Sequence, residues 1–128
     1  MNIPISKKHT KTGSVVWVTG LSGAGKTTLA EKISNDLRSS GWTVVLLDGD
    51  VLREALGVET LHNIEDRLAI AKKYSGICQI LASQGLVVVI ATISLFPEVH
   101  SWNRQNLPGY IEVFLKVPIT ELKRRDSK

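Results

Sequence analysis

Residues 15–28, with the sequence VVWVTGLSGAGKTT, join an apolar β-branched run to a glycine-rich loop and the start of a helix. Residues 20–27 follow the pattern G-x-x-x-x-G-K-[ST], in which backbone N–H groups turn around phosphate oxygens. We expect this loop to bind a nucleoside triphosphate, with Lys26 on the β- and γ-phosphates and the Thr27 hydroxyl on Mg²⁺. The residues predicted to contact the triphosphate are Gly20, Leu21, Ser22, Gly23, Ala24, Gly25, Lys26, Thr27 and Thr28.

Four apolar runs alternate with helical stretches along the chain, a pattern typical of a parallel sheet covered by helices on both faces. The first helix is expected over residues 28–37, and a long helix over residues 64–84 is ended by Gly85. We therefore predict a three-layer α/β/α fold of the P-loop NTPase class with four strands present, in the order 2-3-1-4. The predicted strands are residues 15–19, 43–47, 86–91 and 110–115.

The 128 residues suit one domain, which we divide into a mobile leader over residues 1–13 and a core over residues 14–128. The longest apolar stretch, residues 86–91, is too short to cross a bilayer, and the N-terminus lacks the apolar segment of a secretory signal. We therefore expect no membrane partner and take a cytoplasmic location as the default.

Cysteine content and charge exclude further classes of protein. Cys78 is the single cysteine, so an internal disulfide and a cysteine-based metal site are excluded, and we interpret Cys78 as a core residue. The net charge of +4 comes mostly from basic residues at the two ends of the chain, without aromatic residues between them. This distribution does not favour a nucleic-acid partner.

A second motif, D-G-D-V-L-R at residues 48–53, directly follows the second apolar run. Ligands bind at this edge of an open α/β sheet, outside the carboxyl ends of the strands. One of Asp48 and Asp50 can orient or deprotonate an acceptor hydroxyl while the other holds Mg²⁺ through water, and Arg53 can hold an anionic part of the acceptor. The structural alternative is an acidic turn in which Asp50 caps a short helix over residues 51–56.

With these motifs in this order, the chain resembles the adenosine 5′-phosphosulfate kinase family, also called adenylylsulfate kinases. The resemblance covers nearly the whole chain from Val15 onward. The segments that carry it are G-L-S-G-A-G-K-T-T at residues 20–28, D-G-D-V-L-R at 48–53, the pair Asp66-Arg67, A-T-I-S at 91–94, Arg104, and R-D-S-K at 125–128.

The resemblance implies transfer of the γ-phosphoryl group of ATP to the ribose 3′-hydroxyl of adenosine 5′-phosphosulfate, with Mg²⁺, as part of sulfate assimilation. Ser94 matches a serine that descriptions of the family mark as a phosphoserine intermediate, although a serine at a strand end can equally donate to the substrate. Phe96 and Trp102 are candidates for stacking on a base or for core packing. The implied assignments are Lys26, Asp48, Asp50 and Ser94 to catalysis, Thr27 and Asp48 to the metal, and Asp50, Arg53, Arg67, Ile93, Ser94, Phe96 and Arg104 to the acceptor.

The chain also departs from the family pattern near the acceptor. Residues 95–97 read L-F-P where the family usually has proline, an aromatic residue and a basic residue, and His100 stands where an arginine is common. His100 can be a weak anion contact, but we interpret it as an exposed helix residue. Residues 70–73 read I-A-K-K where the family has N-I-R-R. These differences keep open a related kinase that acts on another small hydroxylated anion.

The resemblance stops at Lys128, where the family continues into a lid and a final strand. We therefore expect a truncated member that keeps the phosphate loop and the acceptor edge but lacks the lid and the fifth strand. A non-catalytic ATP-binding module, acting as a regulatory or assembly partner of a sulfate-activating enzyme, is the alternative from a different class. Among partners, we expect a homodimer or association with a sulfate-activating enzyme. A GTPase is disfavoured because the chain has no N-K-x-D element.

Overall fold

The computed structural model describes residues 12–21, 23–58 and 63–126. In these ranges it has four strands and five helices, which alternate along most of the chain. Their bounds are β1 (Ser14–Gly20), α1 (Lys26–Ser39), β2 (Val44–Asp48), α2 (Gly49–Ala55), α3 (Ile64–Ala82), β3 (Val87–Thr92), α4 (Pro97–Asn106), β4 (Tyr110–Leu115) and α5 (Ile119–Asp126).

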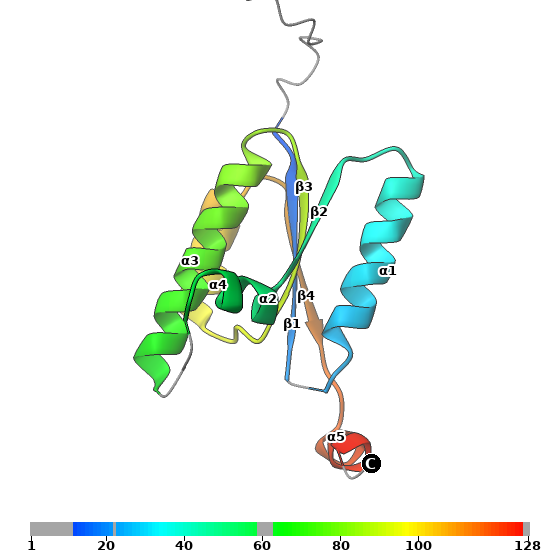
Figure 1. Ribbon diagram of the computed structural model, residues 1–128, viewed down its shortest axis with the longest axis vertical. Coiled ribbons are helices and arrows are strands. Elements are labelled where there is room, and N and C mark those ends of the chain that lie inside the picture. The colour runs from blue at the N-terminus through cyan, green and yellow to red at the C-terminus, as the bar shows by residue number, and fades with distance from the viewer. Residues whose placement is uncertain (1–11, 22, 59–62, 127–128) are drawn as a thin grey trace, which may run out of the picture.

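The four strands form one parallel sheet in the order β2-β3-β1-β4, which confirms the predicted fold class and strand order. Figure 1 shows α1 on one face of the sheet and α3 with α4 on the other, which gives the three expected layers. Among the described residues, no helix combines the length and the apolar content that a membrane span requires.

Successive side chains of β1 point to opposite faces of the sheet, which explains why each face carries a hydrophobic core. Val15 and Trp17 contribute to the cluster under α3 and α4, whereas Val16 and Val18 belong to the cluster under α1. All six residues of β3 are buried, as expected for a strand flanked by two others and covered on both faces. Cys78, predicted as core, is fully buried in the cluster under α3.

Three helix boundaries differ from the predictions. Helix α1 begins at Lys26, two residues before the predicted start, so it includes the end of the phosphate loop. Helix α3 ends at Ala82, and a turn separates it from Gly85. The prediction that Asp50 caps the short helix was wrong, because the carboxylate of Asp48 accepts from the amides of Asp50 and Val51 and α2 begins at Gly49.

The predicted leader, residues 1–13, falls mostly outside the described residues. Gly13 is described, and its N–H donates to the Ala82 carbonyl at 2.6 Å. A Cβ at Gly13 would lie 1.8 Å from the Leu86 carbonyl oxygen, so the backbone passes too close to this connection for any side chain. Gly13 thus joins the start of β1 to the turn between α3 and β3.

Candidate active site

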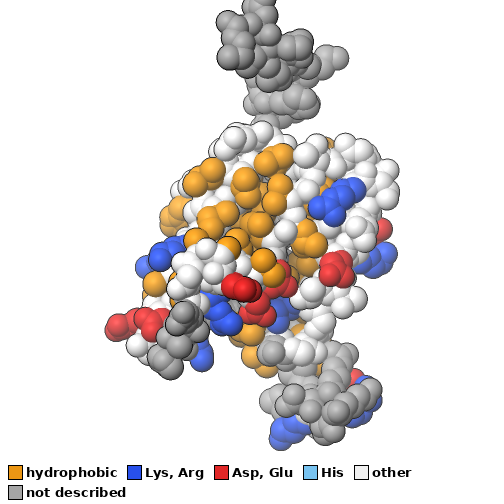
Figure 2. Space-filling view, viewed as in Figure 1, with side chains coloured by type: hydrophobic (Ala, Val, Ile, Leu, Met, Phe, Trp, Pro, Cys, Tyr) orange, Lys and Arg blue, Asp and Glu red, His pale blue; other side chains and the backbone are white. Residues whose placement is uncertain are grey.

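A cavity of about 660 Å³ lies at the carboxyl ends of β1, β2 and β3, where an open α/β sheet binds its ligands. Figure 2 shows acidic and basic side chains gathered in this part of the molecule, below a face that carries apolar side chains. The residues that line the cavity are Gly23, Gly25, Lys26, Thr27, Thr28, Asp48, Gly49, Asp50, Arg53, Arg67, Ile70, Ala71, Tyr74, Ala91, Thr92 and Ile93.

The phosphate loop reaches the cavity through its backbone. Gly25 precedes α1 with φ of 97°, a left-handed conformation that favours glycine, and no side chain caps the helix there. The first N–H groups of an α-helix have no partners within the helix. In α1 they face a cavity rather than a capping side chain, which is the arrangement that binds an anion.

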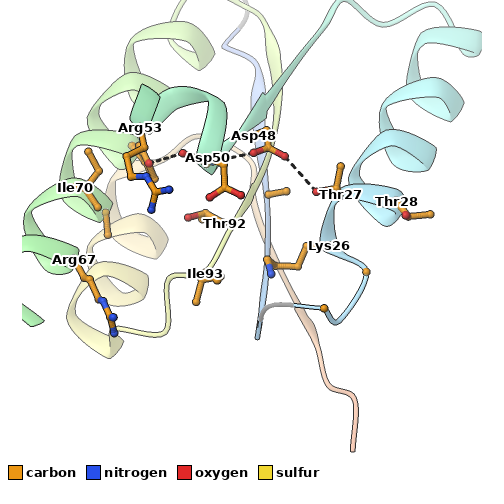
Figure 3. A pocket seen from close by; sticks show the side chains of 16 residues that line it. Lys26, Thr27, Thr28, Asp48, Asp50, Arg53, Arg67, Ile70, Thr92 and Ile93 are labelled. Carbon is orange, nitrogen blue, oxygen red and sulfur yellow. Dashed lines mark hydrogen bonds between the residues drawn. The ribbon is translucent and has the colours of Figure 1, made fainter. Parts of the chain in front are cut away.

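Two side chains at the start of α1 complete this side of the cavity. The Lys26 ammonium donates to the Leu21 carbonyl at 3.0 Å and so lies across the loop. Burial lowers the pKa of Lys26, while the negative charges of Asp50 and Asp48 act in the opposite direction. The Thr27 hydroxyl donates to Oδ2 of Asp48 at 3.2 Å. The loop and the D-G-D turn therefore meet at one point (Figure 3).

Thr27 and Asp48 are the residues best placed to hold a metal ion. Their hydroxyl and carboxylate oxygens are hard ligands, which Mg²⁺ prefers. Among the described residues, no three His, Cys, Asp or Glu side chains gather into a metal site of their own. This pairing suits Mg²⁺ because that ion usually takes one or two protein ligands and completes its shell with water and substrate phosphates.

Asp48 and Asp50 have different surroundings, although one residue separates them. One oxygen of Asp48 caps α2 and the other contacts Thr27, so both are engaged by protein groups. Asp50 is exposed, and Figure 3 shows its carboxylate pointing toward the space between Arg53 and Lys26. The Asp48 carboxylate is therefore occupied by protein groups, whereas that of Asp50 faces the open cavity.

The far side of the cavity combines two arginines with an apolar wall. Arg53 comes from α2 and Arg67 from α3, and Figure 3 shows them at different heights along this side. Ile70, Ala71 and Tyr74 line the cavity from α3, each almost fully buried. This wall presents two cations for an anionic ligand and an apolar surface beside them.

Several predicted site residues lie elsewhere. Ser94 is 1% exposed, and its backbone N–H and carbonyl both bond the Thr19 hydroxyl, at 3.1 and 3.0 Å. Phe96 packs against the core, and Arg104 donates to Glu112 at 2.8 Å. Ser22 falls outside the described residues. The predicted residues that do not line the cavity are Gly20, Leu21, Ala24, Ser94, Phe96 and Arg104.

The interpretation of His100 as an exposed residue was wrong. Its side chain is 12% exposed, with Nε2 2.6 Å from the Ser94 carbonyl and Nδ1 3.6 Å from the Glu112 carboxylate. Trp102, on the same helix, lies 39% exposed outside the cavity. His100 faces inward because the loop after β3 and the edge strand β4 both bring oxygen atoms to the side of α4 where it lies.

Tyr74 is the main cavity residue that the sequence analysis did not assign. It lies seven residues after Arg67 on α3, which places both on one face of the helix. Its hydroxyl donates to the Gly49 carbonyl at 2.6 Å. The sequence carries one signal for this position, which is a hydroxyl within an otherwise apolar helical stripe.

Comparisons with known proteins agree with this geometry. The family model described as adenylylsulphate kinase matches residues 12–128. The cytidine diphosphoramidate kinase of Campylobacter jejuni is 36% identical over 114 residues, which are 89% of this chain and 66% of that protein. The adenylyl-sulfate kinase of Chloroflexus aurantiacus is 40% identical over 119 residues, which are 93% of this chain and 64% of that protein.

The solved structures give the same result. The Mycobacterium tuberculosis APS kinase in complex with AMPPNP and APS superimposes with a TM-score of 0.81 at 32% identity, covering 91% of this chain and 70% of that one. The chain thus spans about two thirds of the length of the curated relatives it matches. From the family match and from its phosphate loop and D-G-D turn, the chain belongs to the adenylylsulphate kinase family of P-loop phosphotransferases.

Proposed function

We propose that this protein transfers the γ-phosphoryl group of ATP to a ribose hydroxyl of a small nucleotide that carries a further anionic group, with adenosine 5′-phosphosulfate as the first candidate. The observation that carries the proposal is the composition of one cavity. Its phosphate loop lies on one side, two arginines lie on the other, and the carboxylate of Asp50 lies between them.

The donor side of the cavity supplies charge for the phosphates of ATP. The N–H groups at the start of α1 and the ammonium of Lys26 hold the phosphate oxygens. Thr27 and Asp48, the latter directly or through water, would hold Mg²⁺, which would supply neutralisation of the phosphate charge. Because Asp48 also caps α2, the same carboxylate links the metal position to the D-G-D turn.

Asp50 is the group proposed to act on the acceptor hydroxyl. Phosphoryl transfer needs a nucleophile in line with the leaving oxygen, and an aspartate can accept the hydroxyl proton as the new P–O bond forms. The Asp50 carboxylate faces the cavity, whereas that of Asp48 is engaged by the cap and by Thr27. In this proposal Asp50 is the base or orienting group and Asp48 the metal-side residue.

Arg53 and Arg67 are proposed to hold the anionic part of the acceptor. Arginine binds phosphate-like groups through paired N–H donors in a fixed plane. The structure of the Mycobacterium tuberculosis relative includes APS, which supports a phosphosulfate as the group bound by this family. Ile93 also lines the cavity, between Arg67 and Lys26 in Figure 3, and adds apolar surface. Under this proposal the protein acts in sulfate activation.

A second acceptor class is favoured by residues 70–74. Ile70 and Ala71 present apolar surface to the cavity, while Lys72 and Lys73 are exposed and lie outside its lining. Arg53 and Arg67 are therefore the cations on this side of the described cavity. A relative that is 36% identical is a cytidine diphosphoramidate kinase. We therefore include a nucleotide with a diphosphoramidate end as the alternative acceptor.

The test measures ATP consumption with Mg²⁺ in the presence of adenosine 5′-phosphosulfate, of cytidine diphosphoramidate, or of no acceptor. It is run on this chain and on the product of its complete reading frame. Stimulation by one acceptor identifies the substrate, and removal of Mg²⁺ with a chelator abolishes it. ATP binding without stimulation by either acceptor contradicts the proposal and favours another acceptor or a non-catalytic ATP-binding module.

A further inference from the structure

Tyr74 reaches from α3 to the turn that carries the two aspartates. Its side chain borders the cavity and is 4% exposed, and its hydroxyl donates to the Gly49 carbonyl, 25 residues earlier, at 2.6 Å. Burial raises the pKa of the Tyr74 hydroxyl, as do the negative charges of Asp50 and Asp48, while Arg53 acts in the opposite direction. The hydroxyl therefore keeps its proton and remains a donor.

The bond from Tyr74 fixes one particular peptide plane. The Gly49 carbonyl and the Asp50 N–H belong to the same peptide group, which is planar. At one end of this plane the carbonyl accepts from Tyr74, and at the other end the N–H donates to Oδ1 of Asp48 at 2.8 Å. Because both ends are bonded, rotation of the plane would break two hydrogen bonds, which favours one direction in which Asp50 leaves the backbone.

The end of β3 restricts the same turn. A Cβ placed on Gly49 would lie 3.0 Å from the Thr92 hydroxyl oxygen and 3.1 Å from the Ala91 carbonyl oxygen. The turn is therefore pressed against the sheet on one side and held by Tyr74 on another. Since Arg67 and Tyr74 lie on the same face of α3, the helix that offers a cation to the acceptor also holds the aspartate turn.

The ring of Tyr74 would fill this part of the core equally well as phenylalanine, so the hydroxyl needs a separate explanation. We propose that Tyr74 is a positioning residue, whose hydroxyl fixes the Gly49–Asp50 peptide and thereby holds the Asp50 carboxylate in line with an acceptor bound at Arg67. This inference rests on the proposed function, in which Asp50 acts on the acceptor hydroxyl.

The test compares Tyr74→Phe with Tyr110→Phe. Tyr110 is a matched control because its hydroxyl also donates a hydrogen bond within the protein, here to the Glu112 carboxylate at 2.9 Å, but it lies outside the cavity. For Tyr74→Phe we expect kcat to fall about 10- to 100-fold, as for a misplaced catalytic group, with the KM for ATP within about twofold. For Tyr110→Phe we expect both constants to stay within about twofold of the parent.

A double variant separates positioning from packing. If Tyr74 acts through Asp50, then adding Tyr74→Phe to Asp50→Asn causes no further loss of kcat, because the group being positioned is already disabled. If the two losses multiply, Tyr74 acts independently of Asp50 and the inference is overturned. A kcat for Tyr74→Phe within about twofold of the parent overturns it as well.

Amide hydrogen exchange followed by NMR tests the same inference without any substrate. In Tyr74→Phe we expect faster exchange at the amides of Asp50 and Val51, with unchanged exchange in β1 and β3. Faster exchange throughout the chain, or no change at Asp50, overturns the inference. If the parent transfers phosphoryl to no acceptor, the proposed function fails, while this measurement still decides whether Tyr74 holds the turn.

Discussion

The donor and acceptor sides of the cavity are built in different ways. Most of the donor side is one continuous segment, the phosphate loop and the first turn of α1, to which Asp48 adds a carboxylate from the end of β2. The acceptor side is assembled from α2, α3 and the end of β3, which are separated by long stretches of chain. On the donor side the groups proposed to contact the ligand are mainly backbone N–H groups, whereas on the acceptor side they are side chains. Substitutions should therefore separate the two sides by which kinetic constant they change.

The largest expected effect is the loss of transfer in Lys26→Ala. Removing this cation from the phosphates should lower kcat/KM by about 10²- to 10³-fold. Thermal unfolding should stay near that of the parent, because the Lys26 ammonium bonds a loop carbonyl outside the core. Lys32→Ala is the matched control, since Lys32 lies on the same helix and pairs with Asp36 at 3.2 Å. Retained transfer in Lys26→Ala would contradict its assignment.

The next effect divides the two aspartates. Asp50→Asn should lower kcat by about 10²- to 10⁴-fold with little change in ATP affinity or stability. Asp48→Ala should in addition lower the free energy of unfolding by about 1 kcal/mol, because it removes the cap of α2. It should also raise the Mg²⁺ concentration needed for half-maximal rate. Rates measured at varied Mg²⁺ concentration check the metal requirement, and thermal unfolding checks the loss of stability. Equal behaviour of the two variants in both measurements would contradict the separate roles of Asp48 and Asp50.

A smaller effect tests which arginines hold the acceptor. Arg67→Ala should raise the acceptor KM by about 10- to 100-fold, the value of a charged hydrogen bond, and leave the KM for ATP unchanged. Arg104→Ala should leave the acceptor KM within about twofold, because Arg104 pairs with Glu112 outside the cavity. If Arg104→Ala raises the acceptor KM as much as Arg67→Ala, the assignment carried over from the family holds and the acceptor extends beyond this cavity.

A modest effect on stability is expected at Glu112, which lies on β4 outside the cavity. Burial would raise the pKa of Glu112, but hydrogen bonds from Tyr110 and Arg104 and the charge of His100 give a net lowering. A pKa that is lower in the folded state adds stability above the unfolded value, and this stability is lost as the pH falls below it. Between about pH 5 and pH 3 the parent should therefore lose up to about 1 kcal/mol that Glu112→Gln does not lose. Chemical unfolding at several pH values measures the difference, and parallel pH profiles would contradict it.

The smallest expected signal is the reaction of Cys78 with a thiol reagent. Burial raises the pKa of this thiol to about 12, and its side chain lies on the buried face of α3. At pH 8 we expect labelling only through global unfolding, so saturating ATP should slow it. If ATP leaves the labelling rate unchanged, then α3 opens locally and the acceptor side is less stable than the donor side.

The cavity-lining part of the donor side could be found from sequence because the loop and the start of α1 are contiguous, and the predicted Lys26, Thr27 and Thr28 all line the cavity. The sequence assigns Thr27 and Asp48 to the metal, and their hydrogen bond at 3.2 Å is consistent with the rule that ligand-binding strand ends meet at one edge of the sheet. The acceptor side could be predicted only in part, since a motif does not show which side chains turn inward. His100 meets Glu112 because α4 packs beside β4, and Tyr74 meets Gly49 because α3 crosses the turn after β2. The roles assigned to Ser94, Phe96 and Arg104 stay predictions.

The strand order also limits when the strands of the sheet can pair during synthesis. β1 pairs with β3 and β4, and β2 pairs with β3, so β1 and β2 are not neighbours. A nascent chain that has just completed α3 therefore holds two strands with no bond between them. We therefore expect the sheet to form only once β3 is made and can join both, and such non-local pairing is slow. Although the phosphate loop is made early, we expect it to become a binding site only after β3 has joined the sheet. Until then, the exposed apolar residues of β1 and β2 are at risk of aggregation.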